Sequence, residues 1–111
     1  MSVLGTRLPL TTSEANLQAV VIDLARYRQW TFLHLLAARQ EGEEFRVHAK
    51  GDPGFPDLVL ARDGVVLFRE LKRQHAHLRP GQELWARALG SNFAIWRPSD
   101  WNLGEIAREL R

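Results

Sequence analysis

Cysteine is absent from this 111-residue chain. Its absence excludes a disulfide framework, a thiolate zinc finger and catalysis by a thiol nucleophile. The chain also lacks an apolar run near the ~20 residues that cross a bilayer, and its start lacks the charged-then-apolar pattern of a signal peptide. No internal repeat, low-complexity tract or linker divides it. We therefore expect a soluble, intracellular protein without membrane contact, with residues 1–111 forming one domain.

Lysine is scarce, because 13 of the 15 basic residues are arginine and the two lysines are Lys50 and Lys72. The formal net charge of +2 permits nucleic-acid binding but does not require it. Arginine presents a planar fork to phosphate, whereas lysine offers a point charge. Composition by itself leaves the function open.

Helical signals dominate the N-terminal third. Thr11 and Glu14 have the spacing of a capping box, which predicts a helix ending near Arg28. Its expected apolar face contains Leu17, Val20, Val21, Leu24 and Tyr27. Residues 30–36 are consistent with a strand or with a longer helix. Residues 37–44 predict a solvated connection, and the alternation over 45–50 predicts a half-buried strand.

A hairpin is the clearest local prediction. Two β-rich runs, 58–62 and 65–71, are separated only by Asp63-Gly64, the dipeptide that suits a type I′ turn. A two-residue loop pairs Arg62 with Val65, and counting outward brings Asp57 opposite Glu70. Lys72, two residues after Glu70, then points to the same side.

The C-terminal part predicts further elements around a central sheet. After a polar loop at 73–79, Pro80 begins a helix that Gly90 ends, and 93–96 form a short strand. The expected inward positions of that helix are Leu84, Trp85, Ala88 and Leu89. A last helix, capped by Ser99 or Asp100, should bury Leu103, Ile106 and Leu110. The order predicts a small mixed α/β domain.

Opposed carboxylates are destabilising unless a positive charge lies between them. Lys72 alone could supply that charge in a structural salt-bridge cluster. A bound Mg²⁺ could also supply it, since Mg²⁺ prefers one or two carboxylates together with waters and substrate phosphates. Spacing alone leaves both interpretations open.

Two short strings resemble a known signature. Gly-Phe-Pro-Asp-Leu at 54–58, followed by Glu-Leu-Lys-Arg at 70–73, is similar to the PD…(D/E)XK signature of restriction-endonuclease-like nucleases. With Leu-Arg-Pro-Gly-Gln at 78–82 and Trp85, the chain resembles a small stand-alone VRR-NUC nuclease domain of the phage type, over residues 13–110. The resemblance implies a restriction-endonuclease-like α/β core with a central mixed β-sheet flanked by helices.

The resemblance also implies a catalytic site that binds Mg²⁺ or Mn²⁺. Asp57 and Glu70 would be metal-binding carboxylates, with the backbone carbonyl of Leu71 as a further ligand. Lys72 would position the attacking water and stabilise charge at phosphorus. Glu14 would complete the acidic pocket, and Gln82 would close the site. A capping role explains Glu14 equally well from sequence alone.

Basic residues near this signature predict a DNA-backbone contact. The eleven residues 69–79 contain one acidic residue, Glu70, and four basic residues: Arg69, Lys72, Arg73 and Arg79. His75 and His77 lie in the same loop, where phosphate contact is favoured over metal binding because no third soft ligand is near. Lys50 completes the expected DNA-binding set. A charge run of this kind is also typical of an ordinary solvated face.

The sequence thus predicts a metal-dependent endodeoxyribonuclease that reads backbone shape rather than base sequence. The resemblance implies a branched substrate such as a four-way (Holliday) junction, a homodimer, and a phage or prophage product acting in the cytoplasm of a bacterial host. Two alternatives stay open: a nuclease for flap, nicked or linear duplex DNA, and a non-catalytic nucleic-acid-binding module on the same fold.

Overall fold

The computed structural model describes residues 6–35 and 50–111. Its elements follow the order α1 (Glu14–Tyr27), β1 (Thr31–His34), β2 (Leu58–Arg62), β3 (Val65–Leu71), α2 (Pro80–Leu89), the 3₁₀ turn η2 (Gly90–Asn92), β4 (Phe93–Trp96), α3 (Pro98–Asn102) and α4 (Glu105–Glu109). The strand interpretation of 30–36 is confirmed by β1. The predicted connection at 37–44 and nearly all of the predicted strand at 45–50 lie outside the described residues.

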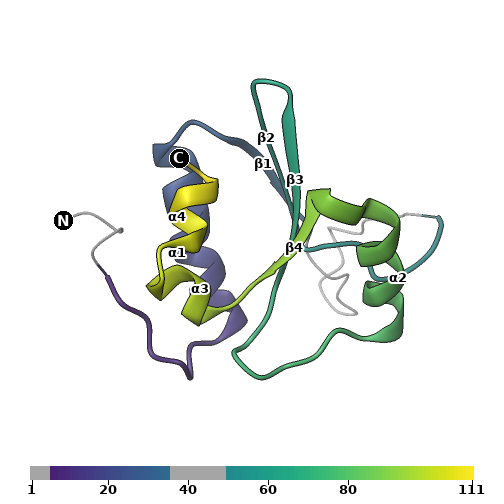
Figure 1. The fold of residues 1–111 in the computed structure, drawn as a ribbon, viewed down its shortest axis with the longest axis horizontal. Coiled ribbons are helices and arrows are strands. Elements are labelled where there is room, and N and C mark those ends of the chain that lie inside the picture. Colours follow the sequence, from purple (N-terminus) through teal and green to yellow (C-terminus); the bar gives the residue numbers. More distant parts are fainter. Residues whose placement is uncertain (1–5, 36–49) are drawn as a thin grey trace, which may run out of the picture.

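The four strands form one sheet in the order β1-β2-β3-β4. The β1–β2 and β2–β3 pairs are antiparallel, whereas β4 runs parallel to β3. A parallel neighbour requires a crossover, which α2 supplies. Helices α1, α3 and α4 gather on one side of the sheet and α2 lies on the other (Figure 1). The predicted α/β class, with a central mixed sheet flanked by helices, is confirmed.

The main core lies between the sheet and the three helices that gather on one side. Its buried apolar side chains come from the sheet, from these three helices and from the segments next to them: Leu17, Val21, Leu24, Ala25, Trp30, Leu58, Leu60, Leu71, Trp96, Trp101, Ile106 and Leu110. Because successive strand residues point to opposite faces, Leu71 enters this core while Glu70 faces the side that carries α2. Among the described helices, none has both the length and the apolar character needed to cross a bilayer.

The start of α1 differs from the prediction. Ser13, not Thr11, is the N-cap, and its hydroxyl oxygen accepts a hydrogen bond from the backbone N–H of Asn16 at 3.1 Å. The hydroxyl of Thr12 donates instead to the carbonyl of Pro9. Three consecutive hydroxyl residues offered three possible caps, and the turn at Pro9 decides among them.

Several expected inward positions are exposed. Tyr27 is 75% exposed, and Ala25 takes its place in the core. Leu103 is 73% exposed because Gly104, with φ +78°, separates α3 from α4 where one helix was predicted. In α2, Leu84 and Ala88 face solvent, and the buried residue is the polar Gln82. Burial of an amide at the start of a helix indicates a specific partner.

Candidate metal and nucleic-acid site

The predicted hairpin brings the two carboxylates together. The observed register pairs Arg62 with Val65 and continues to Leu58 opposite Arg69. Asp63 and Gly64 both have positive φ, +52° and +83°, as a type I′ turn requires. Asp57 lies one residue before the ladder, where its Oδ2 accepts a hydrogen bond from the backbone N–H of Leu71 at 3.1 Å. The carboxylate of Asp57 is thereby fixed beside the end of β3.

Glu70 is buried with an incomplete set of partners. The side chain is 3% exposed, and its Oε2 accepts a hydrogen bond from Nε2 of Gln82 at 2.9 Å. Its Oε1 is buried without a hydrogen-bond partner in the described structure. Burial, followed by the negative charge of Asp57, raises the pKa of Glu70 to about 8, and the positive charge of Lys72 acts in the opposite direction. The pocket therefore disfavours a second negative charge unless a cation is added.

Two glycines allow α2 to reach Glu70. Gly54 has φ +97°, and a Cβ there would lie 2.4 Å from the backbone carbon of Gly81. A Cβ on Gly81 would in turn lie 2.8 Å from the carbonyl oxygen of Pro53. The loop before Asp57 and the first turn of α2 thus touch backbone to backbone, which places the next residue, Gln82, against Glu70.

Aromatic contacts secure the same junction. Phe55 packs edge-on against Phe68 and Trp85, with ring centroids 5.9 and 4.8 Å apart. The indole N–H of Trp85 donates to the carbonyl of Asp52 at 3.0 Å. Trp85 therefore joins α2 to the loop before Asp57, in agreement with its expected packing role.

Lys72 lies on the same side of the sheet as Glu70. It is 6% exposed, and its backbone N–H donates to the carbonyl of Trp96 at 3.1 Å, which continues the pairing of β3 with β4. The ion pairs found among residues 6–35 and 50–111 do not include Lys72. Its ammonium charge is therefore held near Glu70 without a direct carboxylate contact to a described residue.

Glu14 does not join the two carboxylates. It belongs to the exposed first turn of α1, which lies across the sheet from α2. Within the part of the chain that the structure describes, no group of three or more His, Asp or Glu side chains is arranged to hold a metal ion. The expected contribution of Glu14 to an acidic pocket is not supported by this arrangement.

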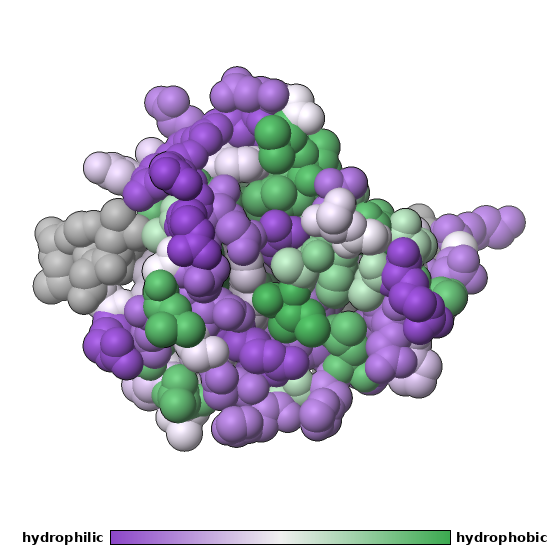
Figure 2. Space-filling model, viewed as in Figure 1, coloured by the Kyte–Doolittle hydropathy of each residue, from purple (hydrophilic) through white to green (hydrophobic). Residues whose placement is uncertain are grey.

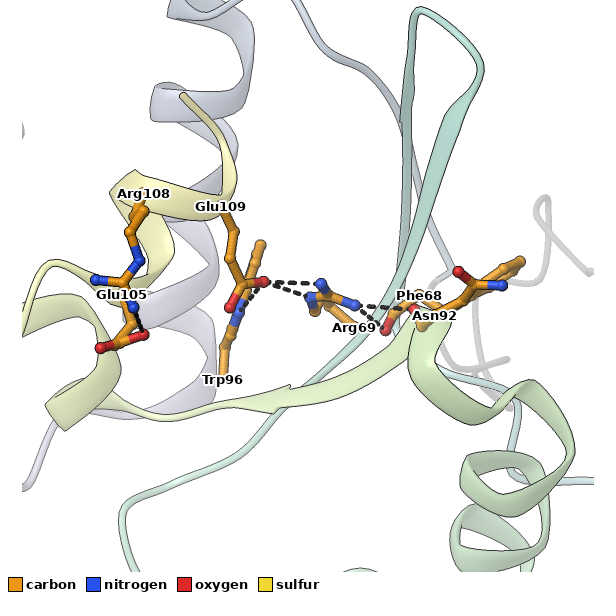
Figure 3. A network of polar contacts seen from close by, with 7 residues as sticks. All are labelled: Phe68, Arg69, Asn92, Trp96, Glu105, Arg108 and Glu109. Atoms are coloured by element: carbon orange, nitrogen blue, oxygen red, sulfur yellow. Dashed lines mark hydrogen bonds and ion pairs between the residues drawn. The ribbon is translucent and has the colours of Figure 1, made fainter.

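Arg69 is a structural residue and not a free contact for DNA. It is 5% exposed, its Nη2 lies 2.7 Å from Oε1 of Glu109, and its guanidinium stacks over Trp96 (Figure 3). It also donates to the carbonyls of Phe68 and Asn92. The reason is strand alternation, because Arg69 shares the core-side face with Leu71, opposite to Glu70 and Lys72. The prediction that Arg69 binds DNA is therefore wrong, because its guanidinium is buried and bonded within the fold.

The other predicted DNA-binding residues are exposed: Lys50, Arg73, His75, His77 and Arg79. Sequence reasoning missed the residue that organises the loop containing Arg73 and His75. Arg97 donates through Nη1 to the carbonyls of Arg73, Gln74 and Ala76 at 2.7, 3.2 and 2.7 Å. An arginine directly before a helix-starting proline gave no sequence signal for this role.

The donor set fits a small, hard divalent cation. Asp57 and Glu70 supply two carboxylates, Glu70 Oε1 has a free acceptor site, and one or two carboxylates with waters are typical of Mg²⁺. Comparisons with protein-family models, curated proteins and solved structures found no significant match to this chain. The geometry of the site is therefore the basis for its chemistry.

Proposed function

We propose that this chain is a Mg²⁺- or Mn²⁺-dependent DNA endonuclease of the PD-(D/E)XK type, with Asp57, Glu70 and Lys72 as its reactive set. The observation that carries the proposal is the buried, unpartnered Oε1 of Glu70, which lies beside a second carboxylate and near a lysine. A structural salt-bridge cluster would give Glu70 a direct ionic partner. The ion pairs found among the described residues leave Glu70 without one.

Each residue has a distinct role in phosphodiester hydrolysis. Asp57, Glu70 and the carbonyl of Leu71 would hold the cation, which supplies charge neutralisation at phosphorus and a more acidic water. The ammonium group of Lys72 donates hydrogen bonds to the attacking water or to a non-bridging phosphate oxygen. Gln82 fixes the orientation of Glu70, and the N–H of Leu71 fixes that of Asp57.

The reaction balances without a further reagent. The water oxygen forms a bond to phosphorus while the bond from phosphorus to the leaving oxygen breaks. The water loses a proton to solvent, and the leaving oxygen gains one. The products are a terminal phosphate and a free hydroxyl.

The proposed substrate is branched DNA, recognised by backbone shape. The described structure has little beyond the sheet and its four helices, so the described residues offer no separate element for reading bases. A symmetric homodimer would bring two sites to a four-way junction, as the resemblance to VRR-NUC nucleases implies. A phage or prophage product in the bacterial cytoplasm is the setting proposed with it.

The test compares labelled four-way junction, flap, nicked, single-stranded and linear duplex DNA with Mg²⁺, Mn²⁺ or EDTA. Lys72→Ala should lower cleavage ~10²–10³-fold, as loss of one transition-state donor does. Arg87→Ala, an exposed basic residue of α2, is the matched control and should leave cleavage unchanged. Cleavage of flap, nicked or linear DNA would keep the nuclease and reject the junction. Metal-independent DNA binding without cleavage would establish the binding module instead.

A further inference from the structure

A hollow of about 340 Å³ lies between the segment before α1 and the segment that follows β3. Its lining comes from two segments distant in sequence, Leu10 and Thr11 before α1 and residues 73–76 after β3. These segments lie side by side at the lower edge of the molecule in Figure 1, where Figure 2 shows mainly hydrophilic residues. Arg73, which lines the hollow, directly follows Lys72 in the chain.

The wall formed by residues 73–76 is held rigidly from behind. Nη1 of Arg97 donates hydrogen bonds to the carbonyls of Arg73, Gln74 and Ala76. The side-chain amide of Gln74 exchanges two hydrogen bonds of 2.9 Å with Ser99, donating to its hydroxyl and accepting from its backbone N–H. The carbonyls of Arg73, Gln74 and Ala76 are thereby used internally, whereas the side chains of Arg73 and His75 stay exposed.

The chemistry of the lining favours an anion. It includes an arginine, a histidine and the hydroxyl of Thr11, and none of its residues is acidic. A guanidinium matches the oxygen pairs of a phosphate group. Preorganised donors also bind without the entropic cost of ordering a loop.

We propose that this hollow binds a second DNA phosphate, one that flanks the scissile phosphate, with Arg73 as its main ligand and His75 and Thr11 as further donors. The inference rests on the proposed nuclease function and adds to it a subsite that sets how the DNA backbone enters the catalytic site. Arg97 is a positioning residue for this subsite, because it acts through the loop and not on the phosphate.

The first arm of the test needs no cleavage. Inorganic phosphate is titrated into the metal-free protein while NMR follows the side-chain resonances of Arg73 and His75. Saturable shifts are expected in the wild type and in Arg87→Gln, and should be lost in Arg73→Gln. Absence of saturable shifts in the wild type would overturn the subsite, whether or not the protein cuts DNA.

The second arm separates DNA phosphate from free phosphate. Arg73→Gln should raise KM for the cleaved DNA ~10-fold with little change in kcat, and should lower the salt dependence of binding by about one counterion. Arg87→Gln should change neither. Phosphate binding with an unchanged KM would overturn the assignment to DNA. Phosphate and DNA binding at the hollow without metal-dependent cleavage would keep the subsite and reject only the nuclease.

Discussion

Replacing Glu70 by Gln should stabilise the metal-free protein above neutral pH, although it should abolish cleavage. The amide keeps the shape of the side chain and an acceptor for Gln82, but removes the buried charge. In the fold, the pKa of Glu70 is raised from 4.5 to about 8. Because the pKa of Glu70 is raised in the folded state, protonated Glu70 contributes fully to stability below pH about 4.5. This contribution is lost as the pH rises through about 8.

The size of this stability difference can be worked out because, between pH about 4.5 and about 8, Glu70 keeps its proton only in the folded state. Each pH unit lowers the free energy of unfolding by ~1.4 kcal/mol while Glu70 is protonated in the fold and ionised in the unfolded chain. Between pH of about 5.5 and 7.5 the wild type should therefore lose roughly 2–3 kcal/mol relative to Glu70→Gln. For a domain of this size, that corresponds to a difference in Tm on the order of 10 °C.

The assay is urea unfolding in EDTA at both pH values, because the difference between the two proteins cancels the other titrating groups. Glu83→Gln, which changes an exposed acid in the first turn of α2, should follow the wild type. Added Mg²⁺ should raise the stability of the wild type at the higher pH and leave Glu70→Gln unaffected. Parallel pH dependence of the wild type and Glu70→Gln would refute the reasoning.

Three further substitutions test one contact of the site and two contacts of the fold. Gly54→Ala should lower the free energy of unfolding by about 2–4 kcal/mol and abolish metal-dependent cleavage, because a Cβ there meets the backbone of Gly81. The control Gly64→Ala adds only left-handed strain in open space, so it should lower the free energy of unfolding by ~1 kcal/mol in the same urea assay. Arg69→Met should destabilise the fold by about 2–4 kcal/mol, since it removes the partner of Glu109, while gel-shift titrations should show an unchanged salt dependence of DNA binding. Ser13→Ala should lower Tm by the equivalent of ~1 kcal/mol, and Thr11→Ala should leave it nearly unchanged; equal effects would contradict the observed N-cap.

Local rules were sufficient where a few neighbouring residues determine the backbone. Asp63-Gly64 predicted the hairpin and its register, because a two-residue turn with positive φ leaves one pairing. Strand alternation from that register then puts Asp57, Glu70 and Lys72 on one side of the sheet. The resemblance to PD…(D/E)XK proteins rests on the same residues, so the proposed function and the geometry that the turn implies depend on one short stretch of sequence.

Tertiary packing decided the rest. Arg69 looked like part of a basic strip, but the face of β3 on which it lies meets Glu109 and Trp96, which the sequence places 40 and 27 positions away. Arg97 likewise donates hydrogen bonds to carbonyls of the distant segment 73–76, and Gly54 touches the backbone of Gly81. No local sequence pattern relates these segments to each other. Sequence therefore determined which side chains share a strand face, because the period of a strand is local. Only the packed structure decided which of those faces are buried, since burial depends on long-range contacts.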